Sequence, residues 1–339
     1  MNRWTSYTFR NGKRAPNRVV VPPMASQSAD ANGFISDRTK EHYSELCKSG
    51  AGLLFVEYSF VHVSGKGEPN HLGVNADDKI EGIASLAKII KDHDMLSGLQ
   101  IVHNGAKSKK EYCGGELLGA SAIRVPTKSG DLDLPRILSL EEVQEMKEWY
   151  VAAAGRVSEA GFDFVELHNA HGYGLNQWLS PITNQRSDRA GGGIEGRSNL
   201  LLEITRSIKE LYPNLLLSTR LPLHDHYENG LTKEDMFWVV GELIDIGLDL
   251  IDVSSGIGGW RRPRDFLGEG YLVDDAAVFK AHFSSSSDQV PVIGVGGIKS
   301  GPYIDKVIGE GRVDFTAVGR AILKDPSAFY QHVLDPALK

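Results

Sequence analysis

The sequence predicts a single-domain (β/α)8 barrel, also called a TIM barrel, that spans residues 1–339. Eight short apolar runs alternate with helix-length amphipathic segments, a pattern that favours parallel strands joined by helical crossovers. Several of the runs are apolar almost throughout, as in a parallel sheet whose two faces are both covered. Loops rich in glycine and polar residues follow some of these runs, and eight units fit a closed barrel better than an open doubly wound sheet.

The strands are expected, in chain order, at residues 17–24, 51–58, 96–103, 162–168, 215–222, 248–256, 291–297 and 314–320. Two longer irregular stretches, 104–138 and 257–271, follow the third and sixth of these strands. A barrel carries its active-site loops after the strands, so both stretches are predicted to border the site.

Helix starts can be recognised between the strands. Ser36 is a candidate cap for the first helix, and Ser139 is followed three residues later by Glu142, the spacing of a capping box. Thr232 is expected to begin a further helix, which Gly247 ends. These signals place helices where the crossovers of a parallel barrel require them.

Composition excludes several classes of function. The chain has 37 Lys and Arg against 44 Asp and Glu, a net charge of −7 without a long basic run, which argues against nucleic acid or an anionic membrane as partner. Cys47 and Cys113 form neither a disulfide framework nor a metal knuckle. Apolar runs such as 53–56 are far shorter than the roughly 18 residues of a membrane span. We therefore expect a soluble, cytoplasmic protein without a signal peptide.

The last two strands end in residues suited to hold a phosphate. Gly296 and Gly297 follow the seventh strand, while Gly319 and Arg320 end the eighth. Exposed backbone N–H groups beside a guanidinium are the usual phosphate site of such barrels. Tight turns alone would explain the glycines equally well.

Polar residues at other strand ends indicate chemistry. His168 and His171 could direct two imidazole donors at one oxygen, with the phenol of Tyr173 close enough to give a proton. A zinc pair is an alternative that lacks a third ligand at a recognisable spacing, and two ordinary polar histidines are another. Arg220 and Gln100 interrupt apolar strands, so each needs a partner: an anion for Arg220, either a buried carboxylate or a ligand, and a hydrogen-bonding group for Gln100.

Over nearly its whole length the chain resembles the old yellow enzyme family of flavin-dependent oxidoreductases. The most specific segment is 163–197, with a His-x-x-His-Gly-Tyr motif followed by Leu-Ser-Pro, Asn-x-Arg-x-Asp and Gly-Gly. Supporting matches lie near the start of the chain and at 99–107, 249–256 and 318–326.

The resemblance implies FMN at the mouth of the barrel. Residues after the first two strands would line the flavin: Pro23, Met24, Ala25 and Tyr58. Gln100 would bind the pyrimidine edge, and Arg220 would lie near N1 and O2 of the ring. The phosphate would be held by the four strand-end residues Gly296, Gly297, Gly319 and Arg320.

The resemblance also implies the substrate site. His168 and His171 would hold the carbonyl or nitro oxygen of the substrate, and Tyr173 matches the proton donor. The chain departs from the family's pattern at Ala25, where relatives usually carry Thr or Cys, and at Tyr58, which is bulkier than the residue common there. Gln27 stands where one branch has a substrate-binding Tyr.

The expected function is an FMN-containing ene-reductase. NADPH or NADH would reduce FMN, and an α,β-unsaturated carbonyl or a nitroalkene would then accept the hydride at its β-carbon. Preorganised donors at the activating oxygen lower the barrier of such a reaction electrostatically, while the flavin supplies the hydride. Two alternatives remain: a non-redox barrel such as an aldolase or isomerase acting on a phosphorylated substrate, and a degenerate barrel that serves as a binding protein. The partner is a small molecule, no metal is expected, and a homo-oligomer is allowed.

Overall fold

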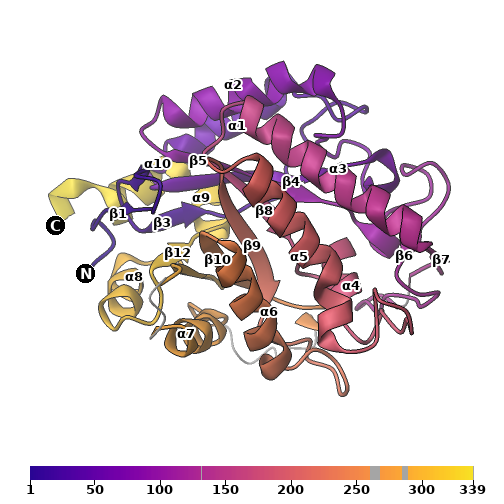
Figure 1. The fold of residues 1–339 in the computed structure, drawn as a ribbon. Coiled ribbons are helices and arrows are strands. Elements are labelled where there is room, and N and C mark those ends of the chain that lie inside the picture. The colour runs from indigo at the N-terminus through magenta and orange to yellow at the C-terminus, as the bar shows by residue number, and fades with distance from the viewer. Residues whose placement is uncertain (131, 260–267, 285–288, 339) are drawn as a thin grey trace.

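Eight parallel strands close into a barrel in a computed structural model that describes residues 1–130, 132–259, 268–284 and 289–338 (Figure 1). In chain order the barrel strands are β3 (Val19–Val21), β4 (Leu53–Phe60), β5 (Leu96–Val102), β8 (Phe164–His168), β9 (Leu216–Pro222), β10 (Leu250–Ser254), β11 (Val292–Gly294) and β12 (Phe315–Ala317). Strand β12 pairs with β3 and so completes the ring. Each of the eight expected strands is confirmed, although the first residue, the last residue or both differ from those of the apolar run that predicted the strand.

Helices surround the barrel, as Figure 1 shows. The long crossover helices are α1 (Asp37–Cys47), α2 (Ile80–Lys91), α3 (Leu140–Glu159), α5 (Ile194–Leu211), α6 (Lys233–Ile246), α7 (Val273–His282) and α8 (Gly301–Gly309). The predicted caps are confirmed: Ser36, Ser139 and Thr232 each close a capping box, and Gly247 ends α6 with a left-handed φ of 113°. Short helices α4 (Gly174–Leu179), α9 (Arg320–Lys324) and α10 (Pro326–Phe329) follow strands β8 and β12.

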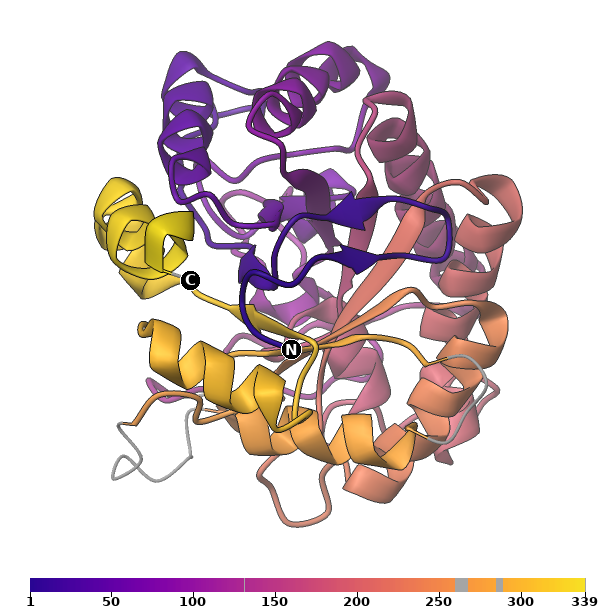
Figure 2. The same cartoon turned by 90° about the vertical axis from the view of Figure 1, so that its left-hand side faces the viewer.

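An N-terminal hairpin that the sequence analysis did not predict covers one end of the barrel. Strands β1 (Tyr7–Thr8) and β2 (Arg14–Ala15) pair antiparallel and lie across the end that faces the viewer in Figure 2. Phe9, in the turn between them, is 4% exposed and packs against Phe164 and Phe315 at ring distances of 5.0 and 5.9 Å. Because apolar side chains fill this end, a ligand site must lie at the opposite end, where the strands finish.

The irregular stretch 104–138 contains one small regular feature. Strands β6 (Leu118–Gly119) and β7 (Arg136–Ile137) pair in parallel and lie away from the chain termini in Figure 1. Of the second stretch, 257–271, residues 260–267 lie outside the described part of the chain. Among the described residues, no helix is long and apolar enough to cross a membrane. The cytoplasmic location and the oligomeric state stay predictions.

Candidate active site

The interior of the barrel changes from apolar to polar toward the carboxyl ends of the strands. Phe164, Leu216 and Leu250 form part of a buried apolar layer above the hairpin. Two residues further along, the same strands carry Glu166, Ser218 and Asp252, and two further still they carry His168, Arg220 and Ser254. Successive inward positions on a strand are two residues apart, so the register stacks these side chains in layers.

The polar layer gives Gln100 and Arg220 the partners that the sequence required. Gln100 Nε2 donates to Glu166 Oε1 at 2.8 Å, and Ser218 Oγ donates to Glu166 Oε2 at 2.7 Å. Arg220 Nε lies 3.1 Å from Asp252 Oδ2 but makes no hydrogen bond there. The anion beside Arg220 is therefore a buried carboxylate, one of the two alternatives.

Burial shifts the protonation of both carboxylates in this layer. It raises the pKa of Glu166, and the negative charge of Asp252 raises it further, while the guanidinium of Arg220 opposes both effects. Burial also raises the pKa of Asp252, against the charge of Arg220. One cation therefore faces two carboxyl groups whose ionisation is opposed by burial.

His168 and His171 lie together at the mouth of the barrel. His168 Nε2 and His171 Nδ1 are 3.3 Å apart, and the two rings are nearly perpendicular at 88°. His171 Nε2 is 2.6 Å from Ser254 Oγ at the end of β10. Desolvation holds the pKa of both imidazoles well below the ordinary value of 6.5, and the charges of Arg220 and Lys107 lower it further. Both rings are therefore neutral near pH 7, able to donate one hydrogen bond each.

Local backbone contacts fix the turn that presents His171. Its φ is 59°, in the left-handed region, and its N–H donates to Ser255 O at 2.8 Å. The next residue, Gly172, also has a positive φ of 71° and donates to Asn176 Oδ1. Lys107 Nζ donates to His171 O at 2.8 Å, which ties the turn to the loop after β5. A strained backbone held by several contacts is typical of a functional site.

Tyr173 belongs to an aromatic group with Tyr58 and His168. Its ring lies 4.9 Å from His168, stacks on Tyr58 at 5.5 Å, and has Lys107 Nζ 4.8 Å from its centre. Desolvation raises the pKa of Tyr173, whereas a hydrogen bond with Tyr58 lowers it. Tyr58 also donates to Glu68 Oε1 at 3.1 Å. The register of strand β4 against β5 shifts between Val56 and Ser59, the stretch that contains Tyr58.

Three of the four predicted phosphate residues line one cavity. A space of about 600 Å³ opens among Gly297, Gly319 and Arg320, and Lys299 and Lys324 add two further cations to its wall. Pro22 and Met24 also line it. The cavity therefore lies where the ends of β3, β11 and β12 meet, and its three cations suit a phosphorylated ligand.

Gly296 does not line this cavity. Its φ is 122°, and a Cβ there would lie 2.9 Å from the backbone nitrogens of Tyr271 and Leu272. Tight packing of backbone on backbone explains this glycine. The backbone N–H groups of Lys299 and Ser300 already donate to Glu269 Oε1, so they are engaged by an anion of the chain itself.

The loop after β3 carries the remaining predicted flavin residues. Pro23 is buried, Met24 half-buried and Ala25 exposed. Glu57 holds the loop that follows, because its Oε2 accepts the Ser26 N–H at 3.0 Å. The methyl group of Ala25 offers no hydrogen-bond donor at this edge.

These residues fit FMN. Arg220 is 7% exposed and its Nε–H has no hydrogen-bond acceptor, which leaves an unpaired buried donor in the uppermost inward layer of the barrel. The Gln100 side chain lies one layer below it, and three cations line the separate cavity beside β11 and β12. A planar ring with an acceptor edge, joined to a phosphate, matches this distribution of donors and charge.

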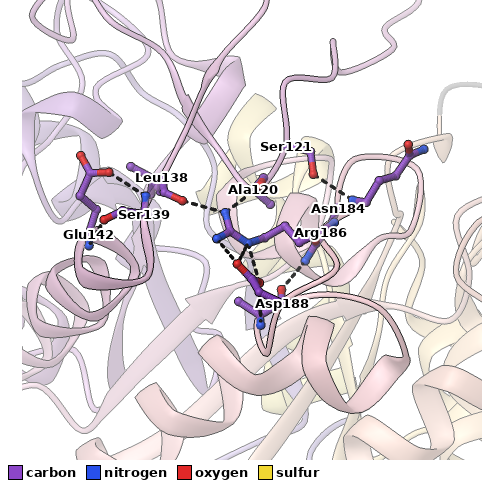
Figure 3. Close-up of polar contacts among 10 residues, drawn as sticks. Ala120, Ser121, Leu138, Ser139, Glu142, Asn184, Arg186 and Asp188 are labelled. Carbon is purple, nitrogen blue, oxygen red and sulfur yellow. Dashed lines mark hydrogen bonds and ion pairs between the residues drawn. The ribbon is translucent and has the colours of Figure 1, made fainter.

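The Asn-x-Arg-x-Asp motif has a structural role, shown in Figure 3. Arg186 donates to the carbonyl oxygens of Ala120 and Leu138 at 3.1 and 2.7 Å and pairs with Asp188. Its backbone N–H donates to Asn184 Oδ1 at 3.2 Å. The motif thus anchors both ends of the short β6–β7 segment beside the site, which explains why the sequence pattern includes residues that do not face a ligand.

His168 and His171 are not part of a metal-binding group in the described residues. The one group of three potential ligands found there consists of His224, His226 and Asp275. The alternative of a zinc pair at the histidine motif therefore gains no third ligand from the fold.

Sequence reasoning missed several residues of the site. Lys107 and Ser254 contact His171, and Lys107 also lines a smaller cavity of about 210 Å³ beside His171 and Ile257. The signal for both lies in the strand ends, since Lys107 follows β5 and Ser254 ends β10. Lys299 and Lys324 could have been found in the same way, as cations next to the predicted phosphate glycines.

The chain is similar to known flavin oxidoreductases. The model of the NADH:flavin oxidoreductase / NADH oxidase family matches residues 8–333. The NADPH dehydrogenase of Geobacillus sp. (strain WCH70) is 32% identical over 324 residues, covering 95% of this chain and 91% of that protein. The NADPH dehydrogenase of Bacillus subtilis (strain 168) is 32% identical over 311 residues, covering 91% and 88%.

Solved structures share the fold. The old yellow enzyme homologue from Zymomonas mobilis superimposes with a TM-score of 0.81 at 20% identity, over 97% of this chain and 91% of that one. Morphinone reductase in complex with tetrahydroNAD gives a TM-score of 0.80 at 22% identity, over 99% and 93%. The family match excludes the non-redox alternative, and the chain belongs to the NADH:flavin oxidoreductase / NADH oxidase family, that of the old yellow enzymes, as an NAD(P)H-dependent FMN oxidoreductase.

Proposed function

We propose that the protein reduces the activated C=C bond of α,β-unsaturated carbonyl compounds or nitroalkenes. The observation that carries the proposal is the pair of neutral imidazoles, His168 and His171, whose facing nitrogens are 3.3 Å apart at the mouth of the barrel. Two donors at this separation can both reach one oxygen at an ordinary hydrogen-bond distance of about 2.9 Å. This substrate class requires such donors, because negative charge develops on the activating oxygen as the β-carbon accepts a hydride.

The chain's residues divide the work among binding, orientation and proton transfer. Bound FMN would supply the hydride-transfer chemistry between NADPH or NADH and the alkene. His168 and His171 hold the substrate's oxygen, and Tyr173 gives a proton to the α-carbon. Neutral imidazoles suit this task, since burial and the nearby cations oppose their protonation.

The cofactor residues follow from the same proposal. Pro23, Met24, Ala25 and Tyr58 would line the flavin, and Gln100 and Arg220 would bind its polar edge. Gly297, Gly319 and Arg320 would hold the phosphate, with Gly296 supporting their loop. The names of the relatives, NADPH dehydrogenase, support NADPH as the reductant.

The test uses the holoenzyme without oxygen. NADPH oxidation is followed with 2-cyclohexen-1-one and with 1-nitrocyclohexene, and the saturated products are identified by gas chromatography. His168→Ala and His171→Ala should each slow alkene reduction by roughly 10²–10³-fold, the loss found when one donor is removed from a comparable oxyanion site. Reduction of the enzyme by NADPH should suffer less.

A matched control lies outside the site. His93 is an exposed histidine whose Nδ1 contacts Ile89 O, and His93→Ala should leave both half-reactions unchanged. An enzyme that consumes NADPH only with oxygen, and leaves both alkenes intact, would contradict the proposal. So would histidine variants that lose both half-reactions equally together with FMN, because that pattern indicates a structural role.

A further inference from the structure

We propose that Ser254 allows His171 to change its tautomer, so that a bound substrate oxygen converts the two histidines from a closed pair into a two-donor clamp. The proposal rests on the proposed function for the identity of the ligand. It assigns a positioning role to a residue at the end of β10, 83 positions from His171 in the sequence.

The tautomer of His168 is fixed by the backbone. Its Nδ1 accepts the N–H of Ala170 at 3.3 Å, so the single proton of the neutral ring is on Nε2. That proton points toward His171 Nδ1. His168 is therefore always a donor toward its neighbour.

His171 has two tautomers, and they leave the site in different states. With the proton on Nε2, His171 donates to Ser254 Oγ at 2.6 Å, and its Nδ1 accepts the hydrogen bond of His168. In this arrangement both facing nitrogens are satisfied by each other. The pair is closed, and a ligand oxygen finds no free donor.

With the proton on Nδ1, the same geometry becomes a clamp. Two N–H groups then face each other across 3.3 Å and repel unless an acceptor lies against both. An oxygen that binds there receives two hydrogen bonds. Binding of the oxygen and the change of tautomer are therefore coupled, because neither is favourable without the other.

Ser254 can hydrogen-bond to either tautomer of His171, so the change of tautomer loses no hydrogen bond at Nε2. A hydroxyl both donates and accepts, so Ser254 can accept from His171 Nε2–H in the closed pair and donate to bare Nε2 in the clamp. A side chain that could only donate, or only accept, a hydrogen bond would favour either the clamp or the closed pair. Lys107 and Ser255 bind the carbonyl and N–H of His171, so the ring can change its proton without moving its backbone.

The first experiment observes the histidine rings of the wild-type site directly. Holoenzyme labelled with ¹⁵N in its histidine rings is recorded with and without p-nitrophenol, whose oxygen imitates that of the substrate, and a His171→Gln sample assigns the signals. We expect His171 to carry its proton on Nε2 in the free enzyme and on Nδ1 in the complex, while His168 keeps its Nε2 proton. The same His171 tautomer in both states would overturn the proposal.

The second experiment measures the role of the hydroxyl. Ser254→Ala should weaken p-nitrophenol binding by roughly 5- to 100-fold, because Nε2 of the clamp tautomer is left buried without a donor. Ser254→Thr keeps the hydroxyl and should restore most of the affinity. Ser49 is also buried, and its hydroxyl has no partner, so Ser49→Ala is a matched control that should bind as the wild type does.

The outcomes separate this proposal from the proposed function. An unchanged Kd in Ser254→Ala, in an enzyme that reduces alkenes, overturns the role of Ser254 alone. A ligand-dependent tautomer and a weakened Kd in an enzyme that reduces no alkene support the clamp and contradict the substrate class.

Discussion

Tyr58→Phe tests whether the unusual tyrosine after β4 assists Tyr173. The change keeps the ring, which stacks on Tyr173 at 5.5 Å and packs edge-on against His71 at 4.7 Å. It removes one hydroxyl, which donates to Glu68 Oε1 at 3.1 Å while Tyr173 keeps its proton, and whose interaction with ionised Tyr173 lowers the pKa of Tyr173. When Tyr173 gives up its proton, this hydroxyl can turn from Glu68 and donate to the new phenolate.

The structure sets the size of the expected effect. Tyr58 is 8% exposed, so water does not readily replace the lost donor. A hydrogen bond to a charged acceptor contributes about 1.5–3 kcal/mol, and the phenolate charge is only partly developed in the transition state. A loss of about 1.4 kcal/mol corresponds to a tenfold slower proton transfer. We therefore expect 2-cyclohexen-1-one to be reduced about tenfold more slowly.

The assay is anaerobic stopped-flow reoxidation of enzyme that has been reduced with one equivalent of NADPH. The nitroalkene serves as the internal control, because its hydride adduct is a stabilised nitronate that solvent can protonate, so its rate should stay unchanged. Tyr173→Phe should show the same selectivity. The double variant should be no slower than Tyr173→Phe alone, since the two hydroxyls act through one proton. Unchanged enone reduction in Tyr58→Phe, or effects of the two changes that simply add, would refute this reasoning.

Three further predictions concern the cofactor region. Ala25→Thr supplies a donor where the methyl offers none, and should raise the flavin midpoint potential by roughly 10–30 mV in a dye-referenced titration; an equal or lower potential would show that Ala25 does not tune the flavin. Glu166→Gln should flatten the dependence of stability on pH. Because the folded-state pKa of Glu166 is raised, its contribution is present below the ordinary value of 4.5 and is lost as the pH rises through the raised pKa. The variant cannot ionise at this position. Its free energy of unfolding, measured with urea, should therefore rise by about 1–2 kcal/mol relative to that of the wild type between acidic and mildly alkaline pH. The same pH dependence in both proteins would contradict this. Arg320→Ala should raise the Kd for FMN about tenfold and weaken its salt dependence, measured by flavin fluorescence on reconstituted apoenzyme; an unchanged Kd would place the phosphate elsewhere.

The sequence by itself determined the architecture and brought several candidate site residues to one end of the barrel. Alternating apolar runs and capped helices located all eight barrel strands, because the period of the pattern and the caps are local properties of a short segment. Convergence of parallel strand ends then placed His168, Arg220 and Gly319 on one face without any knowledge of side-chain positions. Arg220 and Gln100, each a polar residue in an apolar strand, also predicted buried partners, because burying an unpaired polar group is unfavourable in free energy.

Only the tertiary structure decided which groups those partners are. Gln100 meets Glu166 across 66 positions, and Arg220 meets Asp252 on the next strand, because the register of neighbouring strands sets which inward side chains share a layer. Register depends on the packing of the whole barrel and cannot be derived from one strand's composition. The hairpin around Phe9 was missed for the same reason, since its two short strands are stabilised by the barrel end that they cover. The contact of Ser254 with His171 likewise exists only because β8 and β10 both flank β9. The linear sequence does not show which strands are neighbours, so it could not reveal the role proposed for Ser254.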